Sequence, residues 1–193
     1  KLYWSGYKNN SLSWMKKVIV ILGQTATGKS NLAVKIAKKI NGEVISADSR
    51  QVYKGLDIGT GKITKKEMGS VTHYLLDVAN PKKRFSVTEY QKKAIYAIAE
   101  IIKKGKTPII CGGTGFYIDA ITKGVIFPEV PPNQKLRKQL YSKSAIALFE
   151  YLKKIDPRRA KNIDPKNKVR LIRAIEIAKA LGKVPQITEV LPK

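Results

Sequence analysis

The sequence predicts an α/β protein in which a parallel sheet lies between two layers of helices. An unbroken aliphatic run at 18–22 leads through a glycine-rich loop into an amphipathic helix, which is how α/β domains commonly begin. Strand-like and helix-like segments then alternate as far as residue 126. This alternation favours a doubly wound sheet in three layers. Beyond residue 126 only helical patterns follow, so we expect a small helical region there.

The first strand, Val18–Leu22, contains only aliphatic residues, so we expect it to be buried on both faces. Apolar residues at helical spacing from Leu32 to Ile40 predict a helix that ends at Asn41-Gly42. The further elements expected in this region are a strand at 43–47, a loop at 51–70, a strand at 71–78, a helix opened by the capping box Ser86–Glu89 and ended by Gly105, a strand at 107–111 and a helix at 116–122.

Three prolines between 128 and 132 mark a change in composition, and Asn133 can cap a following helix. Helical patterns cover 134–141, 145–155 and 169–181, the last ended by Gly182. We therefore divide the chain into a tail at 1–14, an α/β core at 15–126, a helical insertion at 127–165, and a segment at 166–193 whose helix returns to the core.

The composition points to a polyanionic partner. Among 193 residues, 38 Lys and Arg stand against 14 Asp and Glu, a net charge of +24. Lysine-rich proteomes produce a similar excess without any nucleic acid, so placement matters more than the total. A dense basic group that could bind phosphates comprises Arg137, Lys138, Arg158, Arg159, Lys161, Lys166, Lys168, Arg170 and Arg173.

The single cysteine, Cys111, excludes an internal disulfide, and the single histidine, His73, lacks the partners of a metal site. We interpret Cys111 as a small core residue and His73 as a packing or positioning residue. No apolar run reaches the length of a membrane span, and no secretory signal precedes the core. We therefore expect a cytoplasmic protein that does not associate with membranes.

A phosphate-binding loop is the strongest local motif. Its residues, Gly23, Gln24, Thr25, Ala26, Thr27, Gly28, Lys29 and Ser30, match G-x-x-x-x-G-K-[ST] between a strand and a helix. Backbone amides and the helix start would hold phosphate oxygens, while Lys29 reaches the terminal phosphates and Ser30 is placed to ligand magnesium. The motif fits a diphosphate ester as well as a nucleotide.

Three further candidates follow strands. Asp48 could take a proton from an attacking hydroxyl or amine, or could simply cap a turn. Asp77 could hold magnesium or be an ordinary carboxylate at a strand end, since the strand before Gly112 lacks the acid of a nucleoside triphosphatase. The turn at 112–115 offers backbone amides and the Thr114 hydroxyl to a leaving group, or is a tight structural turn.

Several longer motifs occur in a fixed order, and together they resemble the tRNA dimethylallyltransferase (IPP transferase) family over about Lys16 to Val184. They are Gly-x-Thr-Ala-x-Gly-Lys-Ser at 23–30, Ile-Ser-Ala-Asp-Ser-Arg-Gln-Val-Tyr-Lys-Gly-Leu-Asp-Ile-Gly-Thr-Gly-Lys at 45–62, His-Tyr-Leu-Leu-Asp at 73–77, Pro-Ile-Ile-Cys-Gly-Gly-Thr-Gly-Phe-Tyr at 108–117, Asp156-Pro157, Ile163-Asp164-Pro165, and Val-Arg-Leu-Ile-Arg-Ala-Ile-Glu at 169–176.

The resemblance implies a P-loop fold and transfer of a dimethylallyl group from dimethylallyl diphosphate to the N6 amine of adenosine 37, beside the anticodon, in tRNAs that read codons starting with U. It implies that residues 23–30 bind the diphosphate with Mg²⁺, that Asp48 accepts the amine proton, and that Thr114 assists near the reacting centre. The residues implied in binding the tRNA anticodon stem-loop are Asp48, Ser49, Arg50, Gln51, Arg137, Val169, Arg170, Leu171, Ile172 and Arg173. We expect a monomer.

Members of that family continue for roughly another hundred residues, so we expect this chain to lack their C-terminal part. Two other functions remain open. A P-loop small-molecule or nucleoside kinase would share the loop and Asp48, and predicts ATP turnover that depends on Lys29. A basic RNA-binding module would show binding that falls steeply with salt and has no preference for an anticodon loop.

Overall fold

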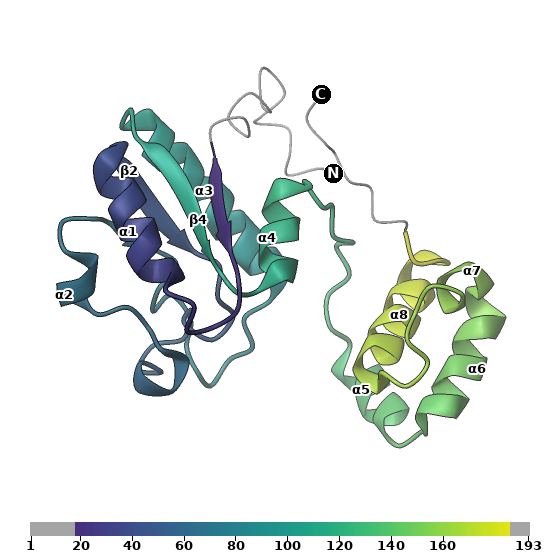
Figure 1. Ribbon diagram of the computed structural model, residues 1–193. Helices are drawn as coiled ribbons and strands as arrows, with labels where there is room; N and C mark the ends of the chain where they lie inside the picture. The colour runs from purple at the N-terminus through teal and green to yellow at the C-terminus, as the bar shows by residue number, and fades with distance from the viewer. Residues whose placement is uncertain (1–17, 186–193) are drawn as a thin grey trace. The chain divides into compact units, whose positions relative to one another are not determined.

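The computed structural model describes residues 18–185, which form two compact units divided between Val125 and Ile126 (Figure 1). The tail predicted at 1–14 and the end of the chain at 186–193 lie outside the described residues. The first unit contains β1 (Ile19–Leu22), α1 (Lys29–Lys39), β2 (Gly42–Ser46), the 3-10 turn η3 (Ile58–Thr60), α2 (Lys65–Met68), β3 (His73–Tyr74), α3 (Val87–Lys103), β4 (Thr107–Gly112) and α4 (Gly115–Thr122).

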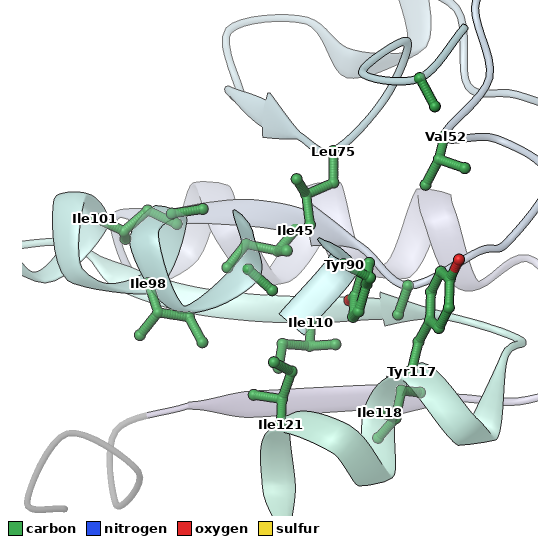
Figure 2. Packing of buried hydrophobic residues seen from close by; sticks show 14 residues of the cluster. Ile45, Val52, Leu75, Tyr90, Ile98, Ile101, Ile110, Tyr117, Ile118 and Ile121 are labelled. Atoms are coloured by element: carbon green, nitrogen blue, oxygen red, sulfur yellow. The ribbon is translucent and has the colours of Figure 1, made fainter. Parts of the chain in front are cut away.

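The sheet has the order β1-β4-β2-β3, and every neighbouring pair is parallel. Because side chains alternate between the faces of a strand, Ile109 packs with α1 on one face and Ile110 packs with α3 and α4 on the other. Figure 2 shows the second of these two clusters. Val44 and Ile45 divide in the same way between the two clusters. These three layers confirm the predicted α/β fold with a parallel sheet.

The prediction that the first strand is buried on both faces is wrong. Among the described strands β1 lies at the edge of the sheet and pairs with β4. Val20 is 39% exposed and Leu22 is 59% exposed, whereas Ile21 is buried. An aliphatic run shows that a segment suits a strand, but it does not show whether the strand has one neighbour or two.

Two predictions about the middle of the first unit need correction. The strand expected at 71–78 shrinks to His73–Tyr74, because Leu75 and Asp77 adopt positive φ values of 63° and 56° that end an extended conformation. The loop expected at 51–70 contains α2, which is opened by a capping box between Thr64 and Glu67. The Thr-x-x-Glu spacing at 64–67 is itself a sequence signal for this helix start.

The second unit consists of α5 (Gln134–Tyr141), α6 (Ala145–Ile155), α7 (Pro157–Ala160) and α8 (Lys168–Leu181). Asn133 caps α5 by accepting from the Leu136 amide at 3.0 Å, and Gly182 ends α8 with a φ of 81°, as predicted. The helix α8 packs against α5 and α6, because its apolar face belongs to the core of this unit. The expectation that it returns to the α/β core stays a prediction.

In the part of the chain that the structure describes, no helix combines the length and the hydrophobicity needed to cross a membrane.

Candidate functional site

The phosphate-binding loop occupies the predicted position between β1 and α1. Gly28 stands immediately before the helix with a φ of 78°, a left-handed conformation that glycine adopts without strain. The loop from Gln24 to Gly28 is exposed. An exposed turn at the start of a helix presents backbone N–H groups to solvent, and it is therefore suited to bind an anion.

The side chains of this loop lie over its backbone. The Lys29 ammonium donates to the carbonyl oxygen of Gln24 and lies 3.3 Å from the Thr27 hydroxyl oxygen. The Thr27 hydroxyl donates to the same carbonyl at 2.8 Å. Ser30 is the second residue of α1 and is half-buried. The cation, the hydroxyl and the helix start therefore belong to one short segment.

A close backbone crossing joins β2 to the turn after β4. The amide of Ala47 donates to the carbonyl of Cys111 at 2.8 Å, and the amide of Thr114 donates to the carbonyl of Ala47 at 3.0 Å. A Cβ atom on Gly112 would lie 2.2 Å from the Ala47 carbonyl oxygen, so no residue larger than glycine fits there. This crossing fixes both loops at the carboxyl edge of the sheet, where open α/β folds bind ligands.

Asp48 and Thr114 are brought together by this crossing. The Thr114 hydroxyl oxygen accepts from the amide of Ser49 at 2.9 Å. The Asp48 carboxylate accepts through Oδ1 from the amides of Arg50 at 2.8 Å and Gln51 at 3.3 Å. Asp48 therefore caps a turn, as one of its two interpretations predicted, and the cap holds the half-buried carboxylate in one orientation.

Gln51 connects this turn to the following loop. Its side-chain amide donates to the carbonyls of Thr60 and Gly61 at 3.3 Å each, and its oxygen accepts from the Ser46 hydroxyl at 3.4 Å. An open depression of about 530 Å³ is lined by Arg50 and residues 55–60. The site predicted at Asp48–Gln51 is thus continuous with a second surface that the sequence did not reveal.

Lys62 is the functional candidate that sequence reasoning missed. Its side chain is 5% exposed, and its ammonium donates to Asp57 and Asp77 at 2.6 Å each and to the Tyr53 carbonyl at 2.9 Å. Burial alone would lower the pKa of Lys62, but the two carboxylates outweigh it and raise the pKa. The carboxylate of Asp77 therefore holds a buried cation, which favours its structural interpretation over magnesium binding.

Stacked tyrosines lie in the core under this edge of the sheet. The rings of Tyr90 and Tyr117 are 4.0 Å apart and nearly parallel, at 13° (Figure 2). Burial, with smaller contributions from Tyr53, Glu89 and Asp48, raises the pKa of Tyr117 to about 12. Both rings belong to the main core cluster of the first unit. They give the loops above a rigid support and remain uncharged at neutral pH.

The other two residues singled out from the sequence lie where a packing role predicts. Cys111 is buried, and burial raises the pKa of its thiol to about 11. His73 is half-buried with Nδ1 2.9 Å from the Val71 carbonyl oxygen, and burial lowers its pKa. Among the described residues no three His, Cys, Asp or Glu side chains are grouped to hold a metal ion.

In the second unit, two of the arginines expected to bind tRNA hold a buried carboxylate. Arg137 contacts Glu176 through Nε at 2.9 Å and Nη2 at 2.8 Å, and Arg173 contacts it through Nη1 at 2.5 Å. The Asn133 amide donates to the same carboxylate at 2.6 Å. The Glu176 side chain is 1% exposed. These hydrogen bonds and cations lower the pKa of Glu176 against the effect of burial.

The rest of the segment expected at the tRNA is divided by the periodicity of α8. Val169 and Arg170 are exposed, whereas Leu171 and Ile172 are buried. The Leu171 and Ile172 side chains fill the core of the helical unit, and the tRNA contact implied for these two residues stays a prediction. Arg170 keeps its side chain on the surface.

The model of the IPP transferase family matches residues 51–191, which is more than half of the chain. The chain belongs to the IPP transferase family. A tRNA dimethylallyltransferase of Lachnoclostridium phytofermentans is 48% identical over 173 residues, covering 88% of this chain and 55% of the relative. One of Anoxybacillus flavithermus is 47% identical over 168 residues, covering 87% and 54%.

Solved structures agree with this membership. A full-length tRNA isopentenylpyrophosphate transferase of Bacillus halodurans is 43% identical, with a TM-score of 0.59 over 86% of this chain and 56% of the other. A eukaryotic dimethylallyltransferase described as acting on tRNA is 31% identical, with a TM-score of 0.77 over 90% and 46%. This chain of the IPP transferase family spans about half the length of the relatives that it matches.

Proposed function

We propose that this chain carries the prenyl-transfer site of a tRNA dimethylallyltransferase. The observation that supports this most directly is the crossing at Gly112, which places the Asp48 carboxylate and the Thr114 hydroxyl on one edge of the sheet. The phosphate-binding loop follows β1 at the same carboxyl edge, because all neighbouring strands are parallel. A base, a polar hydroxyl and a diphosphate cradle are the groups that the reaction needs.

In the proposed reaction, the N6 amine of adenosine 37 attacks the first carbon of the dimethylallyl group. A C–N bond forms, the C–O bond to the diphosphate breaks, and the diphosphate leaves with the bonding electrons. The Asp48 carboxylate takes the proton that the amine must lose. The turn amides of Arg50 and Gln51 already bind Asp48 Oδ1, and this holds the carboxylate in place for that transfer.

Magnesium fits the donors of the phosphate-binding loop. Mg²⁺ is commonly bound by one or two protein ligands together with phosphate oxygens and water. Ser30 would supply a hydroxyl at the start of α1, and the diphosphate would supply the remaining charge. The ion would neutralise the diphosphate as it leaves. Lys29, on the same segment, would bind the same oxygens as a second cation.

The basic character of the chain supports RNA as the acceptor. The net charge of +24 would attract the phosphate backbone of tRNA at long range. The target adenosine must leave its stack to reach Asp48, at a cost of about a few kcal/mol. The anticodon loop is unpaired, so that cost is smaller there than in a duplex. We therefore propose the anticodon loop of tRNA as the acceptor. The resemblance to the family implies tRNAs that read codons starting with U, and we propose these substrates on that ground.

The proposal is tested by incubating the chain with unmodified tRNA, dimethylallyl diphosphate and Mg²⁺, and measuring N6-dimethylallyladenosine by nucleoside mass spectrometry. We expect product with the wild type and its loss with Asp48→Asn. Asp164→Asn is the matched control, because Asp164 caps an exposed turn in the same way, accepting from the Lys166 amide at 2.9 Å. ATP consumption that depends on Lys29, without any modified nucleoside, would overturn the proposal in favour of a kinase.

A further inference from the structure

Ile58 is the most exposed large apolar residue in the described part of the chain. It forms the tip of η3 and is 99% exposed, and its neighbour Leu56 is 42% exposed. An aliphatic side chain held wholly in water gains nothing from folding. Single exposed apolar residues are common on protein surfaces, so the case for a role depends on how this one is held and on what surrounds it.

The loop that carries Ile58 is rigidly fixed. The Thr60 hydroxyl donates to the Leu56 carbonyl at 2.6 Å, and the Gly61 amide donates to the Ile58 carbonyl at 3.1 Å. The amide of Lys62 binds the Asp57 carbonyl at 3.1 Å, while its buried ammonium binds the Asp57 carboxylate. The exposed position of Ile58 is therefore built into the loop, and a partner would meet a surface that is already ordered.

The loop is also fixed to the proposed catalytic turn. Gln51 binds the carbonyls of Thr60 and Gly61, and Gln51 itself is only three residues from Asp48. Arg50, between them, lines the same depression as Ile58 and has an exposed side chain. A ligand whose reacting atom lies at Asp48 would extend over Arg50 toward Ile58.

The charges around Ile58 suit a polyanion. Asp57 is the acidic residue of the segment 55–61, and its carboxylate is paired with Lys62 at 2.6 Å. Arg50 and Lys54 are exposed cations on the adjoining turn. The surface thus offers cations for phosphates and an aliphatic tip for a base, and the charge of its acidic group is partly offset by the Lys62 ammonium, which Asp57 shares with Asp77. A single-stranded RNA loop presents both phosphates and unstacked base faces.

We propose that Ile58 packs against the unpaired RNA base that neighbours the adenosine presented to Asp48. When a base leaves its stack, the adjacent base loses a neighbour, and an apolar side chain can cover the exposed face. This inference rests on the proposed function, because it takes the anticodon loop as the ligand. Ile58 is therefore a binding residue that acts beside the reacting centre and not on the reacting atoms.

The test is binding of this chain to a fluorescent anticodon stem-loop RNA with 2-aminopurine beside the target adenosine. We expect Ile58→Ser to weaken binding about tenfold, the size expected when an aliphatic side chain is no longer buried against its partner, and to reduce the change in 2-aminopurine fluorescence. Ile58→Leu should restore both. The salt dependence of binding should stay as in the wild type, because no phosphate contact is lost.

Ile146→Ser is the matched control, because Ile146 is 77% exposed on α6 of the other unit. It should leave affinity unchanged, and neither serine variant should change the melting temperature. If Ile58→Ser binds the RNA as tightly as the wild type does, the inference about Ile58 is overturned and the proposed function is unaffected. A change in self-association of Ile58→Ser, seen by sedimentation, would also overturn it and would identify the tip as a contact between copies.

The inference and the proposed function fail in different ways. Failure of the wild type to bind the stem-loop more tightly than a fully paired duplex would overturn this inference and the choice of RNA substrate together. Tight binding that depends on Ile58, without formation of dimethylallyladenosine, would support the inference and contradict the proposed activity.

Discussion

The hydroxyl oxygen of Thr114 accepts a hydrogen bond from the backbone amide of Ser49 at 2.9 Å, although 65 residues separate them in the sequence. This bond links the turn after β4 to the turn that carries Asp48. Ser49 and Thr114 each lie two residues after a residue of the close Ala47–Gly112 crossing, which leaves the two backbones little room to move. The relative position of Asp48 and Thr114 is therefore set by the backbone of two strands.

Thr114→Val should affect the rate of the proposed prenyl transfer more than it affects the unfolding free energy. Loss of the bond from the Ser49 amide should cost about 1 kcal/mol of unfolding free energy. The proposed prenyl transfer should fall more, by at least about tenfold, because we propose that this hydroxyl assists near the reacting centre. Thr114→Ser keeps the oxygen and should keep most activity. Chemical denaturation and single-turnover nucleoside mass spectrometry measure the two effects, and an unchanged transfer rate in Thr114→Val would contradict this role.

Gly112→Ala should destabilise the first unit strongly. The added Cβ would lie 2.2 Å from the Ala47 carbonyl oxygen, and strand backbones cannot separate without breaking the β2–β4 ladder. We expect a loss of about 3 kcal/mol or more. Gly115→Ala is the control, because no atom lies within 4 Å of its added Cβ. Equal unfolding midpoints for the two variants in urea would show that the crossing is less tight than described.

The local elements of the fold were predictable, and the reason is visible in α6. Its bounds, Ala145–Ile155, match the predicted range because a helix of this kind depends on a Ser144 cap and its own apolar spacing. The edge position of β1 and the shortness of β3 were not predictable, since both depend on which strands meet. Strand order carries no local signal in the sequence.

The residues of the candidate site likewise divide into those that the sequence predicts and those that only the folded chain reveals. The phosphate-binding loop could be predicted because a continuous motif specifies its backbone, and Asp48 and Thr114 follow strands that end at one edge. The burial of Lys62 and of Glu176 could not be predicted, because each also depends on a more distant partner, Asp77 for Lys62 and Arg137 for Glu176. Charged residues are expected on the surface unless they are paired, and the pairs appear only in the folded chain.

Lys62→Met should loosen the loop of Ile58 as well as reduce stability. Removal of the buried ammonium leaves Asp57 and Asp77 without their cation, and the two carboxylates then repel each other. We expect a loss of about 2 kcal/mol, moderated because both carboxylates are about half exposed. Hydrogen exchange should rise at Gly61 and Lys62 in particular.

Lys153→Met provides the comparison for that variant. Lys153 pairs with Glu150 at 2.6 Å, but both side chains are about half exposed, so its loss should cost at most about 0.5 kcal/mol. A similar cost for the two variants, or exchange at Gly61 equal to that of the wild type, would show that Lys62 does not order the loop.

Glu43 should make stability depend on acid pH. Burial opposes its ionisation, but Lys106, Tyr74 and Lys104 outweigh burial and lower its pKa to about 2. Because the folded pKa lies below the unfolded one, this stabilisation is fully present above about pH 4.5 and is lost as the pH falls toward 2. Its size, from a shift of about two and a half pH units, is about 3 kcal/mol.

The measurement is urea unfolding of wild type and Glu43→Gln across this acidic range. The difference in unfolding free energy between them should be largest near neutral pH and should shrink below about pH 4.5. Glu150→Gln, which changes a carboxylate that is 55% exposed, should show little dependence. A wild-type advantage that persists undiminished at about pH 2 would be inconsistent with the lowered pKa.

Arg137 and Arg170, both expected at the tRNA, should prove to have different functions. Arg137 binds a buried carboxylate with two nitrogens, so Arg137→Ala leaves Glu176 underpaired and should cost about 3 kcal/mol in the helical unit. Arg170 is exposed, so Arg170→Ala should leave stability unchanged while weakening tRNA binding and reducing the salt slope by about one. Thermal unfolding and salt-titrated binding distinguish the two, and a stable Arg137→Ala that loses only RNA affinity would reverse this assignment.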